Sequence, residues 1–473
     1  MIERLSSDSR RCAPGAAFFA YPGESSDGRN YIGDAISRGA AAVLWEEGSF
    51  SWPAQWSVPN AAVAQLKERA GFLAHEFYGR PSERLWVCGV TGTNGKTSCS
   101  QWVAAALGEA GAKAGVIGTL GSGFPGALSA AANTTPDALE VHRLLRDFLQ
   151  AGARGVAMEV SSHGLSQGRV NGVAFDCALL TNLSHDHLDY HGSMESYARA
   201  KGLLFDTPGL SAAVLNLDDV FGVQLARRLT ARGVRTIGYS LSASAIPPGS
   251  VTERIAAEPL QGEVLAVTSS WGEASVPFRQ LGRFNAANAL GVLGCLVAYG
   301  LDFRDAAGRL ANLPPVPGRM ERIAEEPLIV VDYAHSPDAL EKVLTALRPV
   351  AAARGGRLAV VFGAGGDRDA AKRPLMGAIA GRLADRVLIT SDNPRSEDPL
   401  AIMAQIERGV SGAREAEPDR RLAIEKAVRE ADRRDVVLIA GKGHERTQEI
   451  AGRRLAFSDS LAARAALALR TDA

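Results

Sequence analysis

The stretch Gly92-Thr93-Asn94-Gly95-Lys96-Thr97 decides the fold, because it joins an apolar segment that predicts a strand, Leu85–Val90, to a pattern that predicts a helix ending near Glu109. Its glycines allow a tight turn in which backbone N–H groups point at phosphate oxygens, and the helix N-terminus adds partial positive charge. Lys96 is placed to reach the β- and γ-phosphates of a nucleotide, and the Thr97 hydroxyl is placed to bind Mg²⁺. The stretch therefore predicts a phosphate loop inside an α/β domain.

The loop departs by one position from the usual phosphate-loop template. Val90 stands where the template has its first glycine, and Gly89 lies one residue before it. The competing interpretation is a glycine-rich turn that binds nothing. Strand, loop, Lys-Thr pair and helix follow one another in the expected order, which favours a variant phosphate loop.

Outward from this loop, β-rich apolar runs alternate with Ala/Leu-rich helical patterns, which is typical of βαβ units and mostly parallel sheets. A helix is expected at Ile32–Arg38, and residues 240–280, with the alternating Val264–Ser270, predict a β-rich insertion. The other expected strands are Ala16–Ala20, Ala40–Trp45, Ala114–Ile117, Gly155–Glu159, Cys177–Thr181, Ala213–Leu217, Leu328–Val331, Leu358–Phe362, Val387–Thr390 and Val436–Ala440.

The length of 473 residues predicts about three domains. Pro81 and the charged Glu83–Arg84 mark one boundary, and the proline-rich Leu313–Gly318 marks the other. We expect a small N-terminal α/β domain at 1–82, a central P-loop-type domain with a mostly parallel sheet at 83–313, and a Rossmann-like C-terminal domain at 314–473.

Composition narrows the class of protein. The formal net charge is zero, so no basic field points to nucleic acid. The five cysteines form no C-x-x-C pair, which favours reduced thiols over a disulfide framework. Met1–Arg11 is polar, unlike a signal peptide, and no apolar run is long enough to span a membrane. We expect a cytoplasmic protein that acts as a monomer, without membrane or nucleic-acid partners.

Polar clusters follow nearly every expected strand, and parallel sheets bind ligands at the carboxyl ends of their strands. Glu159 is a candidate second Mg²⁺ ligand, with a solvated strand-end glutamate as the alternative. The histidine-rich Asn182–His191 also suits a metal, although zinc is disfavoured because neither cysteine ligands nor an H-E-x-x-H spacing is present. Arg368 and Asp392–Arg395 provide guanidiniums suited to carboxylates, although each arginine alone could equally form a surface ion pair.

Taken in order, the motifs resemble the Mur ligase family over essentially the whole chain. They are GTNGKTS, MEVSSHGL, TNLSHDHLDYHGSMESYARAK, GRFNAANA, GRME, VDYAHSPDAL, FGAGGDRDAAKRPLM and AGKGHE. They look like the branch that adds diaminopimelate or lysine, and Asp392-Asn393-Pro394-Arg395 is the pattern associated with meso-diaminopimelate. The segment before Asp8-Ser9-Arg10 is shorter than family members usually carry.

The resemblance implies a role for each matching residue. Lys96, His187 and Lys201 would be catalytic, with Lys201 carrying a carbamate formed from CO₂. The implied Mg²⁺ ligands are Thr97, Glu159, His187 and Lys201. The implied ATP contacts are Gly92, Thr93, Asn94, Gly95, Lys96, Thr97, Ser98, Asn285, Arg319 and Asp332. The implied contacts to UDP-N-acetylmuramoyl-L-alanyl-D-glutamate are Ser9 at the uridine end and Asn133, Thr134, Thr135, Ser161, Gln167 and Arg169. The implied contacts to the incoming amino acid are Arg368, Asp392, Asn393, Pro394, Arg395, Gly441 and Glu445.

The implied activity is ATP-dependent addition of meso-diaminopimelate to that UDP-muramoyl-dipeptide through an acyl phosphate, in the synthesis of a peptidoglycan precursor. Two related enzymes are alternatives: the lysine-adding ligase, disfavoured by Asp392–Arg395, and folylpolyglutamate synthase, disfavoured by the uridine-binding domain expected at 1–82. An alternative from another class is a regulatory nucleotide-binding protein without ligase activity.

Overall fold

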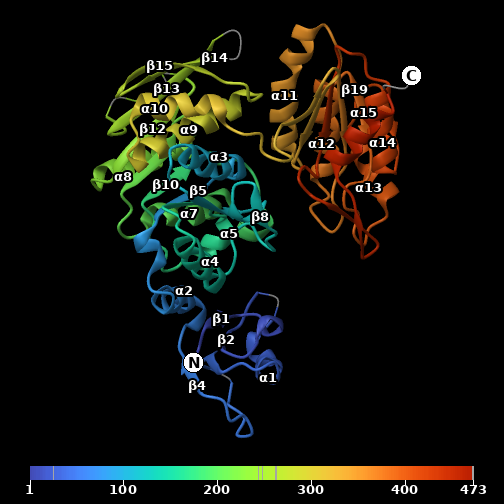
Figure 1. The fold of residues 1–473 in the computed structure, drawn as a ribbon. Coiled ribbons are helices and arrows are strands. Elements are labelled where there is room, and N and C mark those ends of the chain that lie inside the picture. Colours follow the sequence, from blue (N-terminus) through green and yellow to red (C-terminus); the bar gives the residue numbers. More distant parts are fainter. Residues whose placement is uncertain are drawn as a thin grey trace.

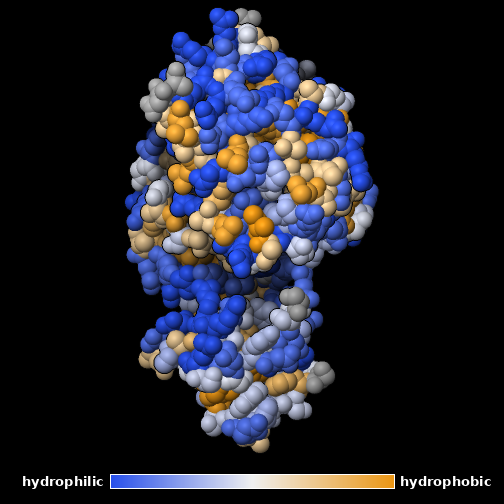
Figure 2. All heavy atoms as spheres, turned by 90° about the vertical axis from the view of Figure 1, so that its right-hand side faces the viewer, coloured by the Kyte–Doolittle hydropathy of each residue, from blue (hydrophilic) through white to orange (hydrophobic). Residues whose placement is uncertain are grey.

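The computed structural model describes residues 1–24, 26–48, 50–242, 244, 246–247, 249–260 and 264–470. Three α/β units follow one another along the chain, each with its own sheet and buried apolar core (Figure 1). The N-terminal unit lies at one end, and the C-terminal unit packs beside the central one with helix α11 (Pro337–Arg354) facing it (Figure 1). From the side, the N-terminal unit forms a separate knob below the wider remainder (Figure 2). No described helix has the length and apolar character needed to cross a membrane.

The N-terminal unit is built on a four-stranded parallel sheet in the order β1-β2-β3-β4. The expected strand at Ala16–Ala20 is confirmed as β2, and the expected helix at Ile32–Arg38 as α1. Its elements are β1 (Arg4–Ser6), β2 (Ala16–Ala20), α1 (Ile32–Ser37), β3 (Ala42–Glu46), β4 (Asn60–Val63) and α2 (Leu66–Phe77).

The central unit is built on an eleven-stranded sheet in the order β15-β14-β13-β12-β11-β10-β5-β9-β6-β7-β8. Its middle strands are parallel, and antiparallel hairpins form both edges, so the β-rich insertion is confirmed as β13 to β15. Residues 243, 245, 248 and 261–263 of that insertion lie outside the described residues. The strands are β5 (Trp86–Thr91), β6 (Ala114–Gly118), β7 (Gly121–Phe124), β8 (Ala127–Ser129), β9 (Gly155–Glu159), β10 (Cys177–Leu180), β11 (Ala212–Asn216), β12 (Arg235–Ser240), β13 (Glu253–Leu260), β14 (Val264–Ser269) and β15 (Gly272–Pro277). The helices are α3 (Lys96–Glu109), α4 (Ala138–Gln150), α5 (Ser162–Ser166), α6 (Leu188–His191), α7 (Met194–Gly202), α8 (Val220–Ala231), α9 (Arg283–Tyr299) and α10 (Phe303–Arg309).

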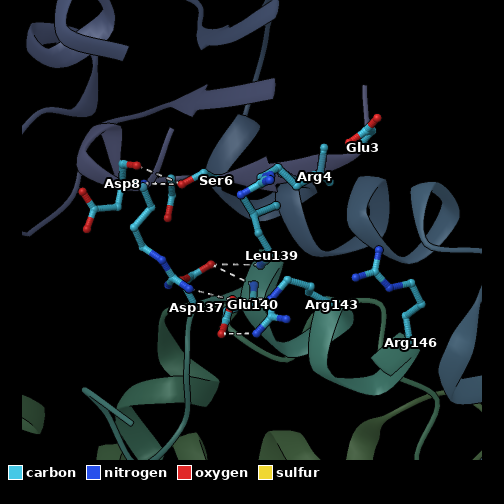
Figure 3. Close-up of a pocket in the computed structure, with 12 residues that line it drawn as sticks. Glu3, Arg4, Ser6, Asp8, Asp137, Leu139, Glu140, Arg143 and Arg146 are labelled. Carbon is cyan, nitrogen blue, oxygen red and sulfur yellow. Dashed lines mark hydrogen bonds and ion pairs between the residues drawn. The ribbon is translucent and has the colours of Figure 1, made fainter. Parts of the chain in front are cut away.

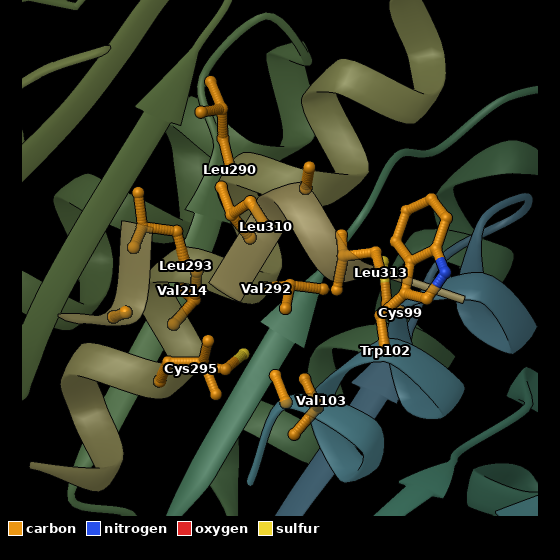
Figure 4. Close-up of a cluster of buried hydrophobic side chains, with 14 of the residues drawn as sticks. Cys99, Trp102, Val103, Val214, Leu290, Val292, Leu293, Cys295, Leu310 and Leu313 are labelled. Atoms are coloured by element: carbon orange, nitrogen blue, oxygen red, sulfur yellow. The ribbon is translucent and has the colours of Figure 1, made fainter. Parts of the chain in front are cut away.

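Both faces of this sheet are buried, which explains why its strands are continuous apolar runs. Successive residues of β5 point to opposite cores: Cys88 and Val90 pack on the side of α3 and α9, and Val87 packs on the side of α4. Figure 4 shows the first core, with Trp102 of α3 beside the apolar side chains of α9. The indole N–H of Trp102 donates to the carbonyl oxygen of Pro314 at 2.8 Å, which fixes the start of the linker to α3.

The C-terminal unit is built on a six-stranded sheet in the order β16-β17-β21-β18-β19-β20, parallel except for β16, with a separate hairpin β22-β23. The expected strands at Leu358–Phe362 and Val436–Ala440 are confirmed as β18 and β21. The strands are β16 (Glu321–Glu325), β17 (Leu328–Asp332), β18 (Leu358–Phe362), β19 (Arg386–Ile389), β20 (Arg414–Ala416), β21 (Val436–Ala440), β22 (Thr447–Ile450) and β23 (Arg453–Ala456). The helices are α11 (Pro337–Arg354), α12 (Lys372–Leu383), α13 (Pro399–Glu407), α14 (Arg420–Arg429) and α15 (Asp459–Ala468).

Candidate active site

The predicted phosphate loop lies between β5 and α3, and its first glycine is Gly92. This residue has φ 146°, and a Cβ there would lie 1.9 Å from the hydroxyl oxygen of Thr181, so only glycine fits. Gly89 lies three residues earlier, inside β5, where a Cβ would lie 2.9 Å from the Phe175 ring. The one-position departure from the template therefore has a packing explanation: Gly89 makes room for the core, and Gly92 shapes the loop.

The Lys96 side chain folds back over this loop. Its Nζ donates to the carbonyl oxygens of Gly92 at 2.8 Å and Thr93 at 2.9 Å. Burial lowers the pKa of Lys96, while the carboxylates of Glu159 and Asp186 oppose that shift. The lysine is held where an incoming phosphate can replace its carbonyl partners.

Glu159 is fully buried at the end of β9 and faces the phosphate loop. Its carboxylate accepts from the Thr97 hydroxyl at 3.0 Å, from the Thr119 N–H at 2.8 Å and from the Thr119 hydroxyl at 3.0 Å. Carboxylate and hydroxyl oxygens are the hard ligands that Mg²⁺ prefers. The donor set of Thr97 and Glu159 therefore fits that ion.

A cavity of about 460 Å³ lies in front of the loop. Its walls come from the residues that follow the carboxyl ends of β5, β9, β10 and β11, and from those that follow β17 of the C-terminal unit. Polar residues at the strand ends of the central and C-terminal units therefore line one cavity. Sequence-predicted residues that line it are Thr93, Asn94, Gly95, Lys96, Thr97, Ser98, Thr134, Glu159, His187, Asn285, Arg319 and Asp332.

Arg319 and Asp332 bring the C-terminal unit to this cavity. The Arg319 guanidinium lies 4.4 Å above the Tyr333 ring and 3.4 Å from the Thr97 hydroxyl oxygen. The buried Asp332 carboxylate accepts from the N–H groups of Met320 and Ala334, both at 2.8 Å. Burial raises the pKa of Asp332, and the charge of Arg319 opposes that shift. One Asp332 oxygen therefore holds the turn that carries Arg319, and the other holds the segment that follows β17.

Lys201 lies behind the phosphate loop and does not belong to the cavity lining. Its Nζ donates to the carbonyl oxygen of Gly92 at 2.9 Å and lies 4.4 Å from the centre of the Tyr197 ring. Burial first, and the charge of Lys96 second, lower the pKa of Lys201 well below its usual value. Two lysine amines therefore share one backbone carbonyl, and the pKa of Lys201 is lowered more strongly than that of Lys96.

His187 also lies near Tyr197, with the two ring centres 6.2 Å apart. Burial lowers the pKa of His187, which keeps the imidazole neutral and able to bind a metal. Its neighbours His163 and His191 complete an aromatic group with Tyr190. Among the described residues, this group offers no set of three histidine or carboxylate ligand atoms close enough for one ion, so zinc gains no support.

The residues predicted to bind the UDP-dipeptide gather below the end of β9. The Thr135 hydroxyl donates to the Glu159 carbonyl oxygen at 2.9 Å, and the Thr135 carbonyl accepts from Arg169 at 2.8 Å. Arg169 also donates to the side-chain oxygen of Gln167 at 2.8 Å. The hydroxyl oxygens of Thr135 and Ser161 are 3.1 Å apart. Four of the predicted residues therefore form one connected polar network.

Three further residues predicted for this substrate lie at the margins of that network. The Thr134 hydroxyl is 3.0 Å from the Thr119 hydroxyl, and Asn133 is exposed on the same loop. Ser9 is buried in the N-terminal unit, where its hydroxyl lowers the pKa of Asp34. Ser9 therefore lies in a different unit from the other predicted residues.

The residues predicted for the incoming amino acid gather at the ends of β18, β19 and β21. Asn393 donates to the Glu445 carboxylate at 2.8 Å, and a Cβ at Gly441 would lie 2.7 Å from an Asp392 oxygen. Arg395, which follows Pro394 and has φ 53°, donates to the Gly366 carbonyl oxygen at 2.5 Å.

Arg368 joins the same group. A Cβ at Gly365 would lie within van der Waals reach of both the Arg395 and Arg368 side chains. Arg368 donates to the Asp367 carbonyl oxygen at 3.2 Å, so its guanidinium keeps donors for a ligand. All seven predicted residues therefore belong to one cluster.

Lys442 is a functional candidate that the sequence analysis assigned no role. It is fully buried, and its Nζ donates to the Asn393 side-chain oxygen at 2.9 Å and to the Glu445 carboxylate at 2.8 Å. Asp392 lies 3.8 Å away. Its position between two glycines, directly after a buried strand and three residues before a glutamate, is the sequence pattern that could have found it.

Asp338 is a second such residue, near the start of α11. Its carboxylate accepts from the Ser184 hydroxyl at 2.9 Å and from the Asn94 side-chain N–H at 3.3 Å. These hydrogen bonds join the C-terminal unit to the phosphate loop of the central unit. No local pattern could have found them, because 154 residues separate Asp338 from Ser184.

A second cavity, of about 470 Å³, lies between the N-terminal unit and α4 (Figure 3). Its charged lining consists of four arginines and four carboxylates: Arg4, Arg11, Arg143, Arg146, Glu3, Asp8, Asp137 and Glu140. Arg143 and Arg11 both pair with Glu140. The formal charges of this lining sum to zero.

The fold and the first cavity define a class: multidomain α/β proteins with a phosphate loop on one sheet and a polar cluster on another. The description "Mur ligase middle domain" matches residues 90–296, "Mur ligase, glutamate ligase domain" matches residues 318–443, and "Mur ligase family, catalytic domain" matches residues 1–78. The chain belongs to the Mur ligase family.

Individual relatives are similar over nearly their whole length. The UDP-N-acetylmuramoyl-L-alanyl-D-glutamate--2,6-diaminopimelate ligases of Chromobacterium violaceum and Pseudomonas aeruginosa are each 50% identical; the matches cover 98% and 99% of this chain and 94% and 95% of theirs. A solved structure of an enzyme with the same name is 35% identical, with a TM-score of 0.68, and the match covers 99% of this chain and 95% of that one. The three-domain fold predicted from the sequence is therefore confirmed.

Proposed function

We propose that this protein is the ATP-dependent ligase that adds meso-2,6-diaminopimelate to UDP-N-acetylmuramoyl-L-alanyl-D-glutamate in the synthesis of a peptidoglycan precursor. The observation that carries the proposal is the cavity between a phosphate loop and the strand ends of the C-terminal domain, with a carboxylate- and guanidinium-rich cluster beside it. The names of relatives that are 50% identical support the choice of substrates.

In the proposed reaction, the side-chain carboxylate of the D-glutamyl residue attacks the γ-phosphate of ATP, which gives an acyl phosphate and ADP. The amine of diaminopimelate then attacks the acyl carbon, and the tetrahedral intermediate expels phosphate. Phosphoryl transfer depends mainly on positioning and charge stabilisation. Lys96 of the central domain and Arg319 of the C-terminal domain supply positive charge to the cavity, and Asn285 also lines it.

Thr97 and Glu159 are the residues we propose to hold one Mg²⁺, and His187 and Lys201 help to hold a second. When bound, Mg²⁺ neutralises charge that develops on the phosphate oxygens. A cationic Lys201 would repel that ion. Its neutral amine can instead add to CO₂, forming a carbamate and releasing one proton. The low pKa of Lys201 favours the amine form that this addition needs.

The incoming amino acid is proposed to bind at the cluster formed by Arg368, Asp392, Asn393, Pro394, Arg395, Gly441 and Glu445. Arg395 offers a planar guanidinium to the distal carboxylate of diaminopimelate. Asp392 and Glu445 are acceptors for its distal ammonium, and Lys442 holds Glu445 in place. Lysine lacks the distal carboxylate and would leave Arg395 without a partner.

The UDP-dipeptide is proposed to lie along the network of Thr135, Ser161, Gln167 and Arg169. It would also contact Asn133 and Thr134 on the loop before Thr135, and Ser9 at its uridine end. We place the domain boundaries after residues 82 and 313. The proposed setting is the cytoplasm, and the proposed active form is a monomer.

The test is phosphate release from ATP with the UDP-muramoyl-dipeptide and a panel of meso-diaminopimelate, LL-diaminopimelate and L-lysine. Release that needs both the dipeptide and meso-diaminopimelate is expected. Efficient use of L-lysine instead would assign the protein to the lysine-adding ligases. ATP turnover that is independent of any amino acid would leave a regulatory nucleotide-binding protein as the better description.

A further inference from the structure

Three buried cysteines from distant parts of the central domain meet in its core. Cys88 lies on β5, Cys177 lies beside it on the neighbouring strand β10, and Cys295 lies on α9. The Cys295 sulfur is 3.8 Å from the Cys88 sulfur and 3.9 Å from the Cys177 sulfur, and all three sulfurs lie within 4.8 Å of one another. Figure 4 shows Cys295 among the apolar side chains of this core.

This triangle has the size that a three-coordinate ion requires. An ion that lies in the plane of three sulfurs, about 2.3 Å from each, needs sulfurs about 4.0 Å apart, and an ion with a lone pair lies above that plane and needs them closer together. Two of the three edges, at 3.8 and 3.9 Å, lie just below the planar spacing, so the sulfurs must approach one another further when such an ion binds. A disulfide would instead need two of these sulfurs to approach to about 2.05 Å.

The apolar core around the three cysteines favours an ion whose charge is balanced by three thiolates. All three cysteines are fully buried in an apolar cluster, where an uncompensated charge is costly. Three thiolates around a monovalent copper ion would leave two negative charges there. Zinc prefers a fourth ligand, and the described residues provide only these three cysteines at the site. A trivalent ion gives a neutral complex with three thiolates and needs no fourth ligand.

We propose that Cys88, Cys177 and Cys295 form a binding site for trivalent, thiol-seeking arsenic, supplied as arsenite. The step is As(OH)₃ + 3 RSH → As(SR)₃ + 3 H₂O. Three As–S bonds form and three As–O bonds break, and each thiol proton leaves in a water molecule. Arsenic stays trivalent throughout, so no oxidant or reductant takes part.

Access to the site requires local opening, because no sulfur of the triangle is exposed. Uptake by the folded protein is therefore expected to be slow and to accelerate in sub-denaturing urea. Once bound, arsenic ties two neighbouring strands to α9 in their native arrangement. A ligand that prefers the native state raises the melting temperature.

The experiment incubates the full chain with sodium arsenite in moderate urea, removes free arsenite and urea, and measures arsenic per chain by elemental analysis. X-ray absorption then reports the atoms bound to arsenic. We expect one arsenic per chain with three sulfur neighbours and a raised Tm. Cys88→Ala, Cys177→Ala and Cys295→Ala should each weaken binding about 100-fold, the share of one ligand in a structural thiolate site.

Matched controls are Cys12→Ala, which removes a buried thiol of the N-terminal domain, and Cys99→Ala, whose thiol donates to the Asn288 carbonyl in the same core. Both variants should bind like the wild type. Should the triangle variants fail to fold, the wild-type absorption spectrum alone decides. Fewer than three sulfur neighbours, no retained arsenic, a lowered Tm or equal losses in the two controls would each overturn the proposal.

Discussion

The hydrogen bonds of Asp338 give a prediction about how the two larger domains hold together. Replacing Asp338 by alanine removes the acceptor for Ser184 and Asn94 at 2.9 and 3.3 Å, and also the ion pair with Lys342 of the same helix at 2.8 Å. Hydrogen bonds to charged groups contribute about 1.5–3 kcal/mol. The carboxylate is 31% exposed and one bond is long, so we take about 1–2 kcal/mol for the pair. This corresponds to about a 5- to 30-fold loss in the population of the arrangement in which α11 contacts the phosphate loop, which we call the closed arrangement.

The assay is steady-state phosphate release with ATP and both other substrates. Asp338→Ala is expected to lower kcat/KM for ATP by about 5- to 30-fold while the protein stays folded, and Asp338→Asn, which keeps an oxygen acceptor, should lose less. Glu341→Ala is the matched control, because this carboxylate lies on the same helix but pairs with Arg382 inside the C-terminal domain.

A double-mutant cycle separates this contact from general damage to α11. Ser184→Ala removes the donor from the central domain, so its effect and that of Asp338→Ala should not add. Strictly additive losses, or an Asp338→Ala enzyme with unchanged kinetics, would refute the inference that this contact stabilises the closed domains.

Four further predictions follow from the site and the core. Lys96→Ala should abolish turnover in a folded protein, because Lys96 is the cation held on the phosphate loop; near-normal phosphate release would contradict the assignment. Lys201→Ala should be nearly inactive and partly rescued by acetate or formate, whose oxygens can replace the carbamate; an active variant would show that no carbamate is needed. Arg395→Ala should raise the apparent KM for diaminopimelate by about 10²-fold or more and change that for ATP little, because removing one partner of a buried charge pair is strongly destabilising; equal use of lysine and diaminopimelate by the wild type would contradict this role. Burial lowers the pKa of His142 to about 4, below its unfolded value of about 6.5, so the folded state binds fewer protons. The neutral His142 contributes about 3 kcal/mol to the free energy of unfolding above pH 6.5, and this contribution is lost as the pH falls through 4. Urea midpoints at pH 7 and 4.5 should therefore differ less in His142→Gln than in the wild type, and equal differences would exclude this source.

The fold was largely predictable because the central strands of both large sheets are buried on both faces. Gly155–Glu159 and Val436–Ala440 are continuous apolar runs that stop at a polar residue or a glycine, and their bounds are confirmed. Short edge strands such as Ala127–Ser129 carry no such pattern, because little of them is buried, and the sequence analysis did not predict them.

The site was predictable where chemistry is local in sequence and unpredictable where it depends on distant chain segments. The phosphate loop could be recognised from six consecutive residues. The role of Lys201 came only from the family resemblance, because a lysine on a helix gives no sign that it will be buried beneath a loop. Asp338 and the three-cysteine triangle depend on tertiary contacts, so no spacing in the sequence could reveal them.

The hydrogen bond between Trp102 and the Pro314 carbonyl makes tryptophan fluorescence sensitive to the position of the linker before the C-terminal domain. All six tryptophans precede residue 272, so the C-terminal domain contributes no indole emission. Trp102 is buried in α3, which begins at the phosphate loop, and its N–H is held by the first residues of the linker. Indole emission depends on that hydrogen bond and on the polarity around the ring. A movement of the C-terminal domain that displaces the linker therefore changes the contribution of Trp102 to the total tryptophan emission, with no dye attached.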